Sequence, residues 1–227
     1  FHVNYVKRKV KIMNLAREIM LAKKFCQAQG IYGAESYIRG FSGYGLECLI
    51  IYYKKFERML KELGKAKERI ILDPEKKFKK KTEILLELNE NRLQSPIVLV
   101  DPTWRERNVL AALSKESFLK FQKAASEFLK KPSTEFFEIR KIDIDRMKEK
   151  AKSNNGEFLY MKIRTDKQKG DIAGTKMKKF SVFLEKEIIA YFDILASEFE
   201  YLEGQEAEFY LIVKPKKEII KFGPPKN

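Results

Sequence analysis

The chain has 227 residues, of which 44% are hydrophobic and 35% are charged, which suits one or two domains with a real core. No run of about 18 or more apolar residues occurs, which argues against a transmembrane helix, and the basic segment 1–11 lacks the apolar core of a secretory signal. The only histidine is His2 and the only cysteines are Cys26 and Cys48, which argues against Ser/His/Asp catalysis, multi-histidine metal sites and a disulfide framework. A cytoplasmic location is the default expectation.

The charge balance predicts a polyanionic partner. Lysine and arginine number 47 against 32 acidic residues, a net charge of +15, and binding to phosphates releases counterions. A single lysine-rich run, such as the lysines at 76–81, also fits a solvated loop. The excess over the whole chain favours nucleic acid.

The first apolar pattern has the three- and four-residue spacing of a helix face and is followed by Gly30, which can end the helix. It consists of Ile12, Leu15, Ile19, Ala22 and Cys26. A second helix is expected between Ser42, as its N-cap, and Gly64. Its broad apolar stripe consists of Leu46, Leu49, Ile50, Tyr53, Phe56, Leu60 and Leu63.

Between residues 69 and 101 the pattern changes to short β-rich runs at 70–72 and 97–100, joined by the lysine-rich segment, which predicts a small strand pair. Ser114 then caps a third helix, which ends at Lys131-Pro132. Its inward-facing residues are Phe118, Phe121, Ala125 and Phe128. The domain boundary is expected there, giving domains at 1–131 and 132–227.

The second domain shows period-two alternation at 159–164 and 207–213, which predicts two strands. A long amphipathic helix is expected between them, with Met177, Phe180, Leu184, Ile188, Tyr191 and Leu195 on its apolar face. The predicted fold class is therefore α+β: a mainly helical central domain with a small strand pair, followed by an α+β domain with a small sheet and a long helix.

Two stretches carry a family resemblance. The first is Ile31-Tyr32-Gly33-Ala34-Glu35 followed by Arg39-Gly40-Phe41-Ser42-Gly43-Tyr44, and the second is Val100-Asp101-Pro102 with Arg107-Asn108 and Leu113-Ser114. In this collinear order they resemble the central region of archaeal-type, class I CCA-adding tRNA nucleotidyltransferases. The resemblance implies a nucleotide-binding neck domain at 1–131 and a partial body domain at 132–227. It also implies that the family's catalytic head and its C-terminal tail are lacking.

The resemblance assigns four residues to the incoming nucleotide. Tyr32 and Lys23 match the tyrosine and the lysine that hold the triphosphate, with Lys24 as a one-residue alternative to Lys23. His2 matches a histidine that contacts the nucleotide, and Arg107 matches an arginine that reads the base edge. From the residues alone, the ordinary interpretations are a core aromatic for Tyr32, a solvated lysine for Lys23 and a surface arginine for Arg107.

Other polar residues receive structural interpretations. Gly40 and Gly43 are expected to allow a tight entry into the second helix, although Ser42 could lend a helix N-terminus to an anion. Asp143 and Asp145 alternate as a metal-binding pair on a strand would, but the expected third carboxylate is missing. Asp145 is instead expected to cap a helix that starts at Arg146.

Together these features predict part of an enzyme that adds CCA to the tRNA 3′ end from CTP and ATP. Mg²⁺ would be bound by the missing head, so this chain has no metal site and is expected to be inactive in isolation. Its partners would be the tRNA acceptor end, ATP, CTP and a separately encoded head if one exists. The alternatives are a non-catalytic RNA-binding protein, a split-enzyme subunit, or part of a related polymerase acting on other RNA ends.

Overall fold

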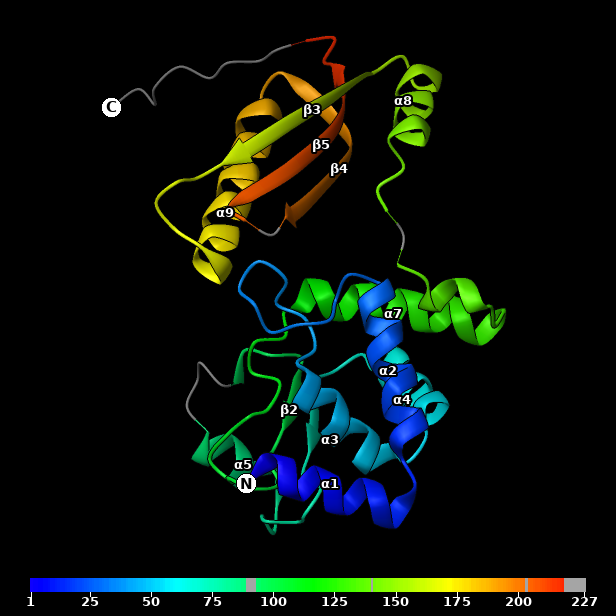
Figure 1. Cartoon of the computed structure of the whole chain (residues 1–227), viewed down its shortest axis with the longest axis vertical. Coiled ribbons are helices and arrows are strands. Elements are labelled where there is room, and N and C mark those ends of the chain that lie inside the picture. Colours follow the sequence, from blue (N-terminus) through cyan, green and yellow to red (C-terminus); the bar gives the residue numbers. More distant parts are fainter. Residues whose placement is uncertain (89–92, 140, 203, 219–227) are drawn as a thin grey trace. The chain divides into compact units, whose positions relative to one another are not determined.

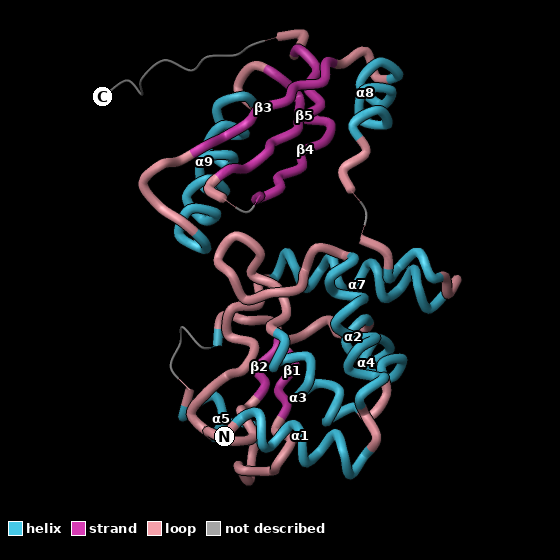
Figure 2. Tube along the Cα trace, viewed as in Figure 1, coloured by secondary structure: helices cyan, strands magenta, loops and turns pink. Residues whose placement is uncertain are grey.

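A computed structural model describes residues 1–88, 93–139, 141–202 and 204–218. The chain divides into two compact units, Phe1–Ile139 and Arg140–Asn227. Both units combine helices and strands, which confirms the predicted α+β class (Figures 1 and 2). Among the described helices, none combines the length and the apolar character that a bilayer-spanning segment requires.

The first unit is mainly helical and contains one small sheet (Figure 1). Its elements are α1 (His2–Met13), α2 (Ala16–Ala28), α3 (Gly43–Tyr53), α4 (Phe56–Gly64), β1 (Ile70–Leu72), α5 (Lys81–Glu87), β2 (Ile97–Leu99), α7 (Lys115–Lys130) and the 3-10 helix η1 (Thr134–Phe137). Helix α3 contacts α1, α2 and α4 and so occupies the interior of this unit.

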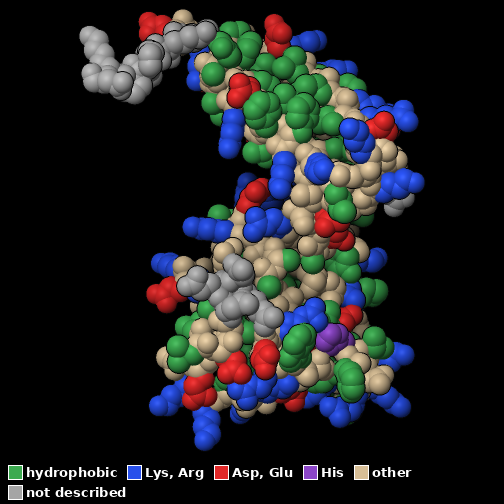
Figure 3. Space-filling model, turned by 90° about the vertical axis from the view of Figure 1, so that its left-hand side faces the viewer, with side chains coloured by type: hydrophobic (Ala, Val, Ile, Leu, Met, Phe, Trp, Pro, Cys, Tyr) green, Lys and Arg blue, Asp and Glu red, His purple; other side chains and the backbone are tan. Residues whose placement is uncertain are grey.

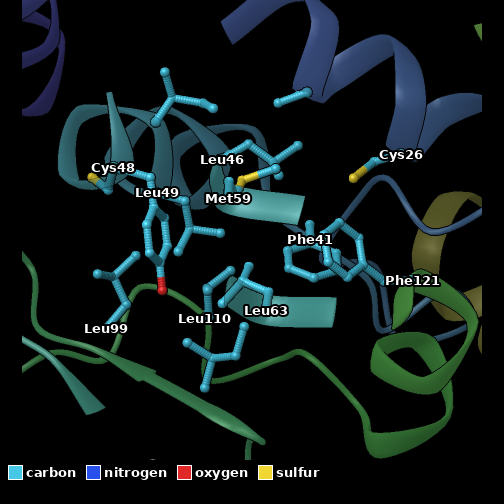
Figure 4. Close-up of a cluster of buried hydrophobic side chains, with 14 of the residues drawn as sticks. Cys26, Phe41, Leu46, Cys48, Leu49, Met59, Leu63, Leu99, Leu110 and Phe121 are labelled. Atoms are coloured by element: carbon cyan, nitrogen blue, oxygen red, sulfur yellow. The ribbon is translucent and has the colours of Figure 1, made fainter. Parts of the chain in front are cut away.

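The sequence of α3 is apolar on most of its circumference, which is typical of a helix inside a core. Leu46, Leu49 and Ile50 are completely buried. Figure 4 shows Leu46 and Leu49 packed among side chains that include Met59 of α4 and Phe121 of α7. Burial of each such side chain contributes about 1.5–3 kcal/mol, so α3 is held firmly in place.

The two serine caps are confirmed, but each of the first two predicted helices is divided into two shorter ones. Ser42 Oγ accepts a hydrogen bond from the Gly45 N–H at 3.0 Å, and Ser114 caps α7 in the same way. The expected continuity of the first two helices is wrong, because Asn14 (φ 49°) and Lys54 (φ 69°) adopt the left-handed conformation. Each break turns the chain and starts a new helix. As a result Ile12, expected on the buried face, is exposed.

The predicted strand pair is confirmed and is parallel, with Ile70 opposite Ile97 and Leu72 opposite Leu99. Parallel neighbours need a crossover connection. The lysine-rich segment provides it and contains helix α5, which the sequence pattern had not indicated. Ile84 of α5 packs on Val98 and covers one face of the pair.

The second unit is a three-stranded antiparallel sheet with the order β3-β5-β4 and a long helix (Figures 1 and 2). Its elements are α8 (Ile144–Ser153), β3 (Glu157–Arg164), α9 (Gly170–Ile188), β4 (Phe192–Leu202) and β5 (Glu206–Pro215). Helix α9 covers one face, where Met177 packs on Ala207 and Leu184 lies in the cluster of Phe209 and Leu211. The predicted small sheet and long helix are confirmed.

The predicted helix is too long at its C-terminal end. Helix α9 stops at Ile188, and Tyr191 and Leu195 belong to a turn and to β4. The spacing of these apolar residues imitates a helix, but β4 alternates and pairs with β5, where Ile194 lies opposite Val213. Phe180, also expected on the buried face, is about half exposed.

The first unit extends beyond Pro132, near which the sequence suggests the domain boundary, and ends at Ile139. Residues of η1 pack into an aromatic cluster around Phe25 of α2, which is completely buried. The ring centroids of Phe136 and Phe137 lie 6.4 and 5.9 Å from that of Phe25. This contact attaches η1 to the first unit, and the chain leaves that unit only after Ile139.

Candidate nucleotide-binding site

The residues that the resemblance assigns to the nucleotide lie together in the first unit, beside the N-terminal part of α3. They form two groups. Helix α3 connects the groups, because it supplies Gly43 and Glu47 to the first and Tyr44 to the second. The first group is Lys23 and Tyr32 beside Gly43 and Glu47, and the second is His2 and Arg107 beside Tyr44 and Asp101. The sequence places these residues far apart, and the packing of α1, α2 and the loop after β2 around α3 brings them close.

In the first group, Lys23 and Tyr32 face the same turn of α3. Lys23 Nζ lies 2.6 Å from Glu47 Oε1, and both side chains are mostly buried. A Cβ atom at Gly43 would lie 2.9 Å from the Tyr32 hydroxyl oxygen and 4.0 Å from Lys23 Cε. A larger residue at position 43 would therefore displace the Tyr32 hydroxyl from its place beside the helix. Lys24 is exposed, so Lys23 is the lysine that belongs to this group.

The loop between α2 and α3 fixes the position of Tyr32. Tyr32 forms a parallel bridge with Phe41, where the Phe41 N–H donates to the Ile31 carbonyl at 2.8 Å and the Gly33 N–H donates to the Phe41 carbonyl at 2.9 Å. The two backbone segments are so close that a Cβ at Gly40 would lie 2.1 Å from the Ile31 oxygen. Gly40 therefore has the architectural role that the sequence indicated.

The second group surrounds one carboxylate. His2 Nε2 lies 3.2 Å and Arg107 Nη1 lies 3.7 Å from Asp101 Oδ2, and the His2 and Tyr44 ring centroids are 4.5 Å apart. The His2 and Arg107 side chains are 41% and 43% exposed, whereas that of Asp101 is fully buried. Figure 3 shows the chain's single histidine at the surface of the first unit. Two accessible side chains thus rest on a buried anion.

A closed turn after β2 builds the position of Asp101. The Asp101 N–H donates to the Arg107 carbonyl at 2.9 Å, and Asp101 Oδ1 accepts from the Thr103 N–H at 2.7 Å and from the Thr103 hydroxyl at 2.8 Å. Asn108 fastens the same turn to β2, because its Oδ1 accepts from the Leu99 N–H at 3.0 Å. Arg107 is therefore presented from a turn that several hydrogen bonds hold together.

The electrostatics keep Asp101 ionised. Burial alone would raise the pKa of its carboxyl, but hydrogen bonds from Thr103 and Tyr44 and the nearby His2 bring that pKa below its ordinary value. Burial raises the pKa of the Tyr44 phenol, with further contributions from Cys48 and Asp101. Tyr44 consequently stays protonated and donates to Asp101 Oδ1 at 3.0 Å.

The neighbouring arginine has a different setting. Arg105 Nη2 lies 3.0 Å from Glu87 Oε1 of α5, and its guanidinium carbon lies 4.9 Å from the ring centroid of Phe78. These contacts direct Arg105 toward α5. Arg107, on the other side of the turn, is the arginine that lies with His2.

Sequence reasoning missed the two acidic partners, Glu47 and Asp101. Asp101 stands in a motif that carried the resemblance, and it follows a buried strand at its carboxyl end, where functional side chains of parallel sheets gather. That position was a usable signal. Glu47 lies in an apolar helix stripe, and only the tertiary contact with Lys23 gives it significance.

Asp143 and Asp145 of the second unit have different surroundings. Asp143, and not Asp145 as predicted, caps α8: Asp143 Oδ1 accepts from the Arg146 N–H at 2.9 Å, so the helix begins at Ile144. The Asp145 side chain is 92% exposed. Across the described ranges, no group of three or more His, Cys, Asp and Glu residues is arranged to hold a metal ion.

Comparison with known proteins identifies the family. The model of the second domain of tRNA nucleotidyltransferases matches residues 17–138, which is more than half of the chain. The chain belongs to the tRNA nucleotidyltransferase family. The matched region coincides with nearly all of the first unit and contains Lys23, Tyr32, Asp101 and Arg107, whereas His2 precedes it.

Curated relatives of this nucleotidyltransferase chain are CCA-adding enzymes. That of Nanoarchaeum equitans is 33% identical over 198 residues, which cover 84% of this chain and 47% of the relative. That of Saccharolobus solfataricus is 34% identical over 192 residues, covering 84% and 42%, and that of Pyrococcus abyssi is 38% identical over 138 residues, covering 60% and 30%. The resemblance to archaeal-type CCA-adding enzymes is confirmed, and the chain spans less than half the length of these relatives.

Proposed function

We propose that this chain is the part of a CCA-adding enzyme that positions the incoming CTP or ATP and the tRNA acceptor end. The observation that carries the proposal is the convergence of His2, Lys23, Tyr32 and Arg107 on the N-terminal part of α3. Residues of the right chemistry for phosphate and for a base edge meet there in one unit of a tRNA nucleotidyltransferase.

The first group suits a triphosphate. The Lys23 ammonium supplies a positive charge on a flexible stem, and the Tyr32 hydroxyl can donate to a phosphate oxygen. In the structure Lys23 contacts Glu47, so a bound triphosphate would compete with that carboxylate for the ammonium. We assign the phosphates to this group.

The second group suits a base. Arg107 offers several N–H donors in a planar fork, which matches the acceptors on a base edge, and His2 can add a further donor or a ring contact. Both side chains are accessible while the carboxylate behind them is not. We assign the base to this group.

The described residues do not fit the catalytic metal. Asp101 faces Arg107 and His2, and Glu47 faces Lys23, so the carboxylates nearest the site already neutralise cations. In such an enzyme Mg²⁺ would stabilise the charge that develops during nucleotidyl transfer. We therefore propose that the metal-binding carboxylates belong to another domain or subunit, and that this chain alone does not catalyse the transfer.

The charge of the chain supports an RNA partner. With a net charge of +15, the chain carries lysine and arginine side chains over both units on the face in Figure 3. Phosphate contacts made by such side chains weaken steeply as salt increases. Binding to tRNA should accordingly fall by orders of magnitude between about 50 and 200 mM salt.

Calorimetric titration of the full chain with CTP and with ATP tests the proposal. Lys23→Ala should weaken binding of both nucleotides by about tenfold, because it removes a charge-assisted contact, whereas Lys24→Ala is the matched control and should leave binding unchanged. Equal effects of the two variants, or the absence of nucleotide binding by the unmodified chain, would contradict the proposal.

A second measurement separates the proposal from its alternatives. The pure chain is incubated with Mg²⁺, CTP, ATP and tRNA that lacks its CCA end, and no incorporation is expected. Tight binding of the acceptor stem without nucleotide binding would favour a non-catalytic RNA-binding protein. Equal binding of an unrelated RNA 3′ end would favour a related polymerase with another substrate.

A further inference from the structure

Asp101 is the least accessible charged group beside the site, and the family resemblance gives it no part in nucleotide binding. Its side chain is fully buried, and the chain surrounds it with three donors to Oδ1: the Tyr44 hydroxyl and the N–H and hydroxyl groups of Thr103. These contacts fix the orientation of the carboxylate. They leave Oδ2 pointing toward the accessible side chains of His2 and Arg107.

The two oxygens of Asp101 have separate surroundings. Oδ1 ties the turn after β2 to α3, and Asn108 fastens the same turn to Leu99 and Leu110 with hydrogen bonds of 3.0 and 2.9 Å. Oδ2 is a buried acceptor, and within the described residues it lies near Arg107 and His2 but accepts no hydrogen bond of good geometry. The fold of the turn therefore uses Oδ1, whereas Oδ2 is turned toward the site.

We propose that Asp101 is a positioning residue, whose Oδ2 holds the Arg107 guanidinium and the His2 imidazole in the orientation that receives the nucleotide base. This inference rests on the proposed function. The contacts of Arg107 and His2 with Oδ2, at 3.7 and 3.2 Å, restrict both side chains on their inner sides while their outer sides stay accessible. A fixed anion limits the rotamers of a long arginine, so less conformational entropy is lost when the base binds.

Asp101→Asn tests this with little change of shape. An asparagine can keep its carbonyl oxygen toward Thr103 and Tyr44, but its uncharged NH₂ group then faces Arg107 and His2, and the Arg107 guanidinium has only donors to offer it. The contact that orients them is lost while the turn is retained. Thermal unfolding of the variant establishes that the turn is intact.

The readout compares CTP with inorganic tripolyphosphate, both titrated calorimetrically into the full chain. Asp101→Asn should weaken CTP binding by about three- to tenfold and leave tripolyphosphate binding unchanged, because Lys23 and Tyr32 lie in the other group. The effect should disappear in an Arg107→Ala, His2→Ala background, since Asp101 would have nothing left to orient. An equal loss for both ligands, or a full effect in that background, would show a merely structural role and overturn the inference.

Because His2 is the only histidine, its ring gives a single set of NMR signals that report on the contact. These signals should shift in Asp101→Asn. If that variant fails to fold, Thr103→Val removes one donor from Oδ1 at a partly exposed position and should cause the same selective loss for CTP, but smaller. Unchanged CTP binding and unchanged His2 signals in Thr103→Val would overturn the inference. No CTP binding by the unmodified chain would instead refute the proposed function.

Discussion

The hydroxyl group of Tyr32 faces Gly43 so closely that a methyl group at residue 43 would lie 2.9 Å from its oxygen. The contact involves the far end of a side chain, which can swing away at small cost. We therefore expect Gly43→Ala to displace the hydroxyl and weaken CTP binding by about fivefold, the effect of one hydrogen bond, without lowering the free energy of unfolding. Calorimetry and urea unfolding measure the two quantities.

Gly64→Ala is the matched control for this substitution. A Cβ at Gly64 would meet only the Ala125 Cβ at 3.5 Å, an ordinary van der Waals distance. Replacing this glycine in α4 should stabilise the chain by up to about 1 kcal/mol and leave CTP binding unchanged. A loss of nucleotide affinity in the control, or a large loss of stability in Gly43→Ala, would contradict the interpretation of Tyr32.

Glu47→Gln should strengthen triphosphate binding. The carboxylate lies 2.6 Å from Lys23 Nζ and neutralises the ammonium that the phosphates would use. Removing its charge should increase the affinity for tripolyphosphate by about two- to fivefold, which is the size of effect expected when a partly exposed ion pair no longer has to be broken. Glu57→Gln, which breaks the exposed pair with Lys61 on α4, should have no effect. Weaker binding by Glu47→Gln would mean that Glu47 orients Lys23 rather than competing for it.

Glu75 should make the stability of the first unit depend on acid pH. It accepts from the Tyr5 hydroxyl at 2.7 Å and lies 2.7 Å from Lys9 Nζ; burial opposes ionisation of its carboxyl, but these two partners bring its pKa below the ordinary 4.5. The unfolded chain therefore binds the proton more readily, and this stabilisation is present above about pH 4.5 and is lost as the pH falls through the lower folded pKa.

Urea unfolding of the chain and of Glu75→Gln at pH 7 and pH 3 measures this dependence. The difference in the free energy of unfolding between the two proteins should be larger at pH 7 than at pH 3. A difference that does not depend on pH would show that Glu75 acts only by packing.

Phe137→Ala should destabilise the first unit by about 2–3 kcal/mol, because it removes an aromatic ring from the cluster. The ring centroid of Phe137 lies 5.9 Å from that of Phe25 and 5.8 Å from that of Phe56. Urea unfolding followed by fluorescence measures the change. Phe183→Ala replaces a half-exposed ring on α9 and should cost less than about 1 kcal/mol. If Phe137→Ala had no effect, η1 would not belong to the first unit.

The sequence predicted those features that local chemistry determines. Ser42 and Ser114 could be recognised as N-caps because serine is a preferred residue directly before an apolar helical pattern. The short apolar run at 97–100 is typical of a buried strand or another core segment. The breaks at Asn14 and Lys54 could not be predicted, since left-handed residues other than glycine are selected by the packing of the helices they separate. Strand β4 was missed because its first apolar residues continue the spacing of α9.

For the site, the sequence predicted residues but not their partners. Lys23, Tyr32 and Arg107 were selected from motifs, and they lie in one region because three distant segments pack on α3. The pairing of Lys23 with Glu47 links residues on different helices, and no local pattern marks such a contact. Their roles in nucleotide binding remain predictions that the measurements above decide.

The sheet order β3-β5-β4 has a consequence for the order in which the chain can fold. The central strand, Glu206–Pro215, comes after both of its neighbours in the sequence, so β3 and β4 have no partner in the sheet until it has been synthesised. The first unit, in contrast, is a compact unit formed within residues 1–139 and can fold while the ribosome is still translating the remainder. A nascent chain arrested before residue 206 should therefore carry a folded first unit and an exposed, unpaired second one.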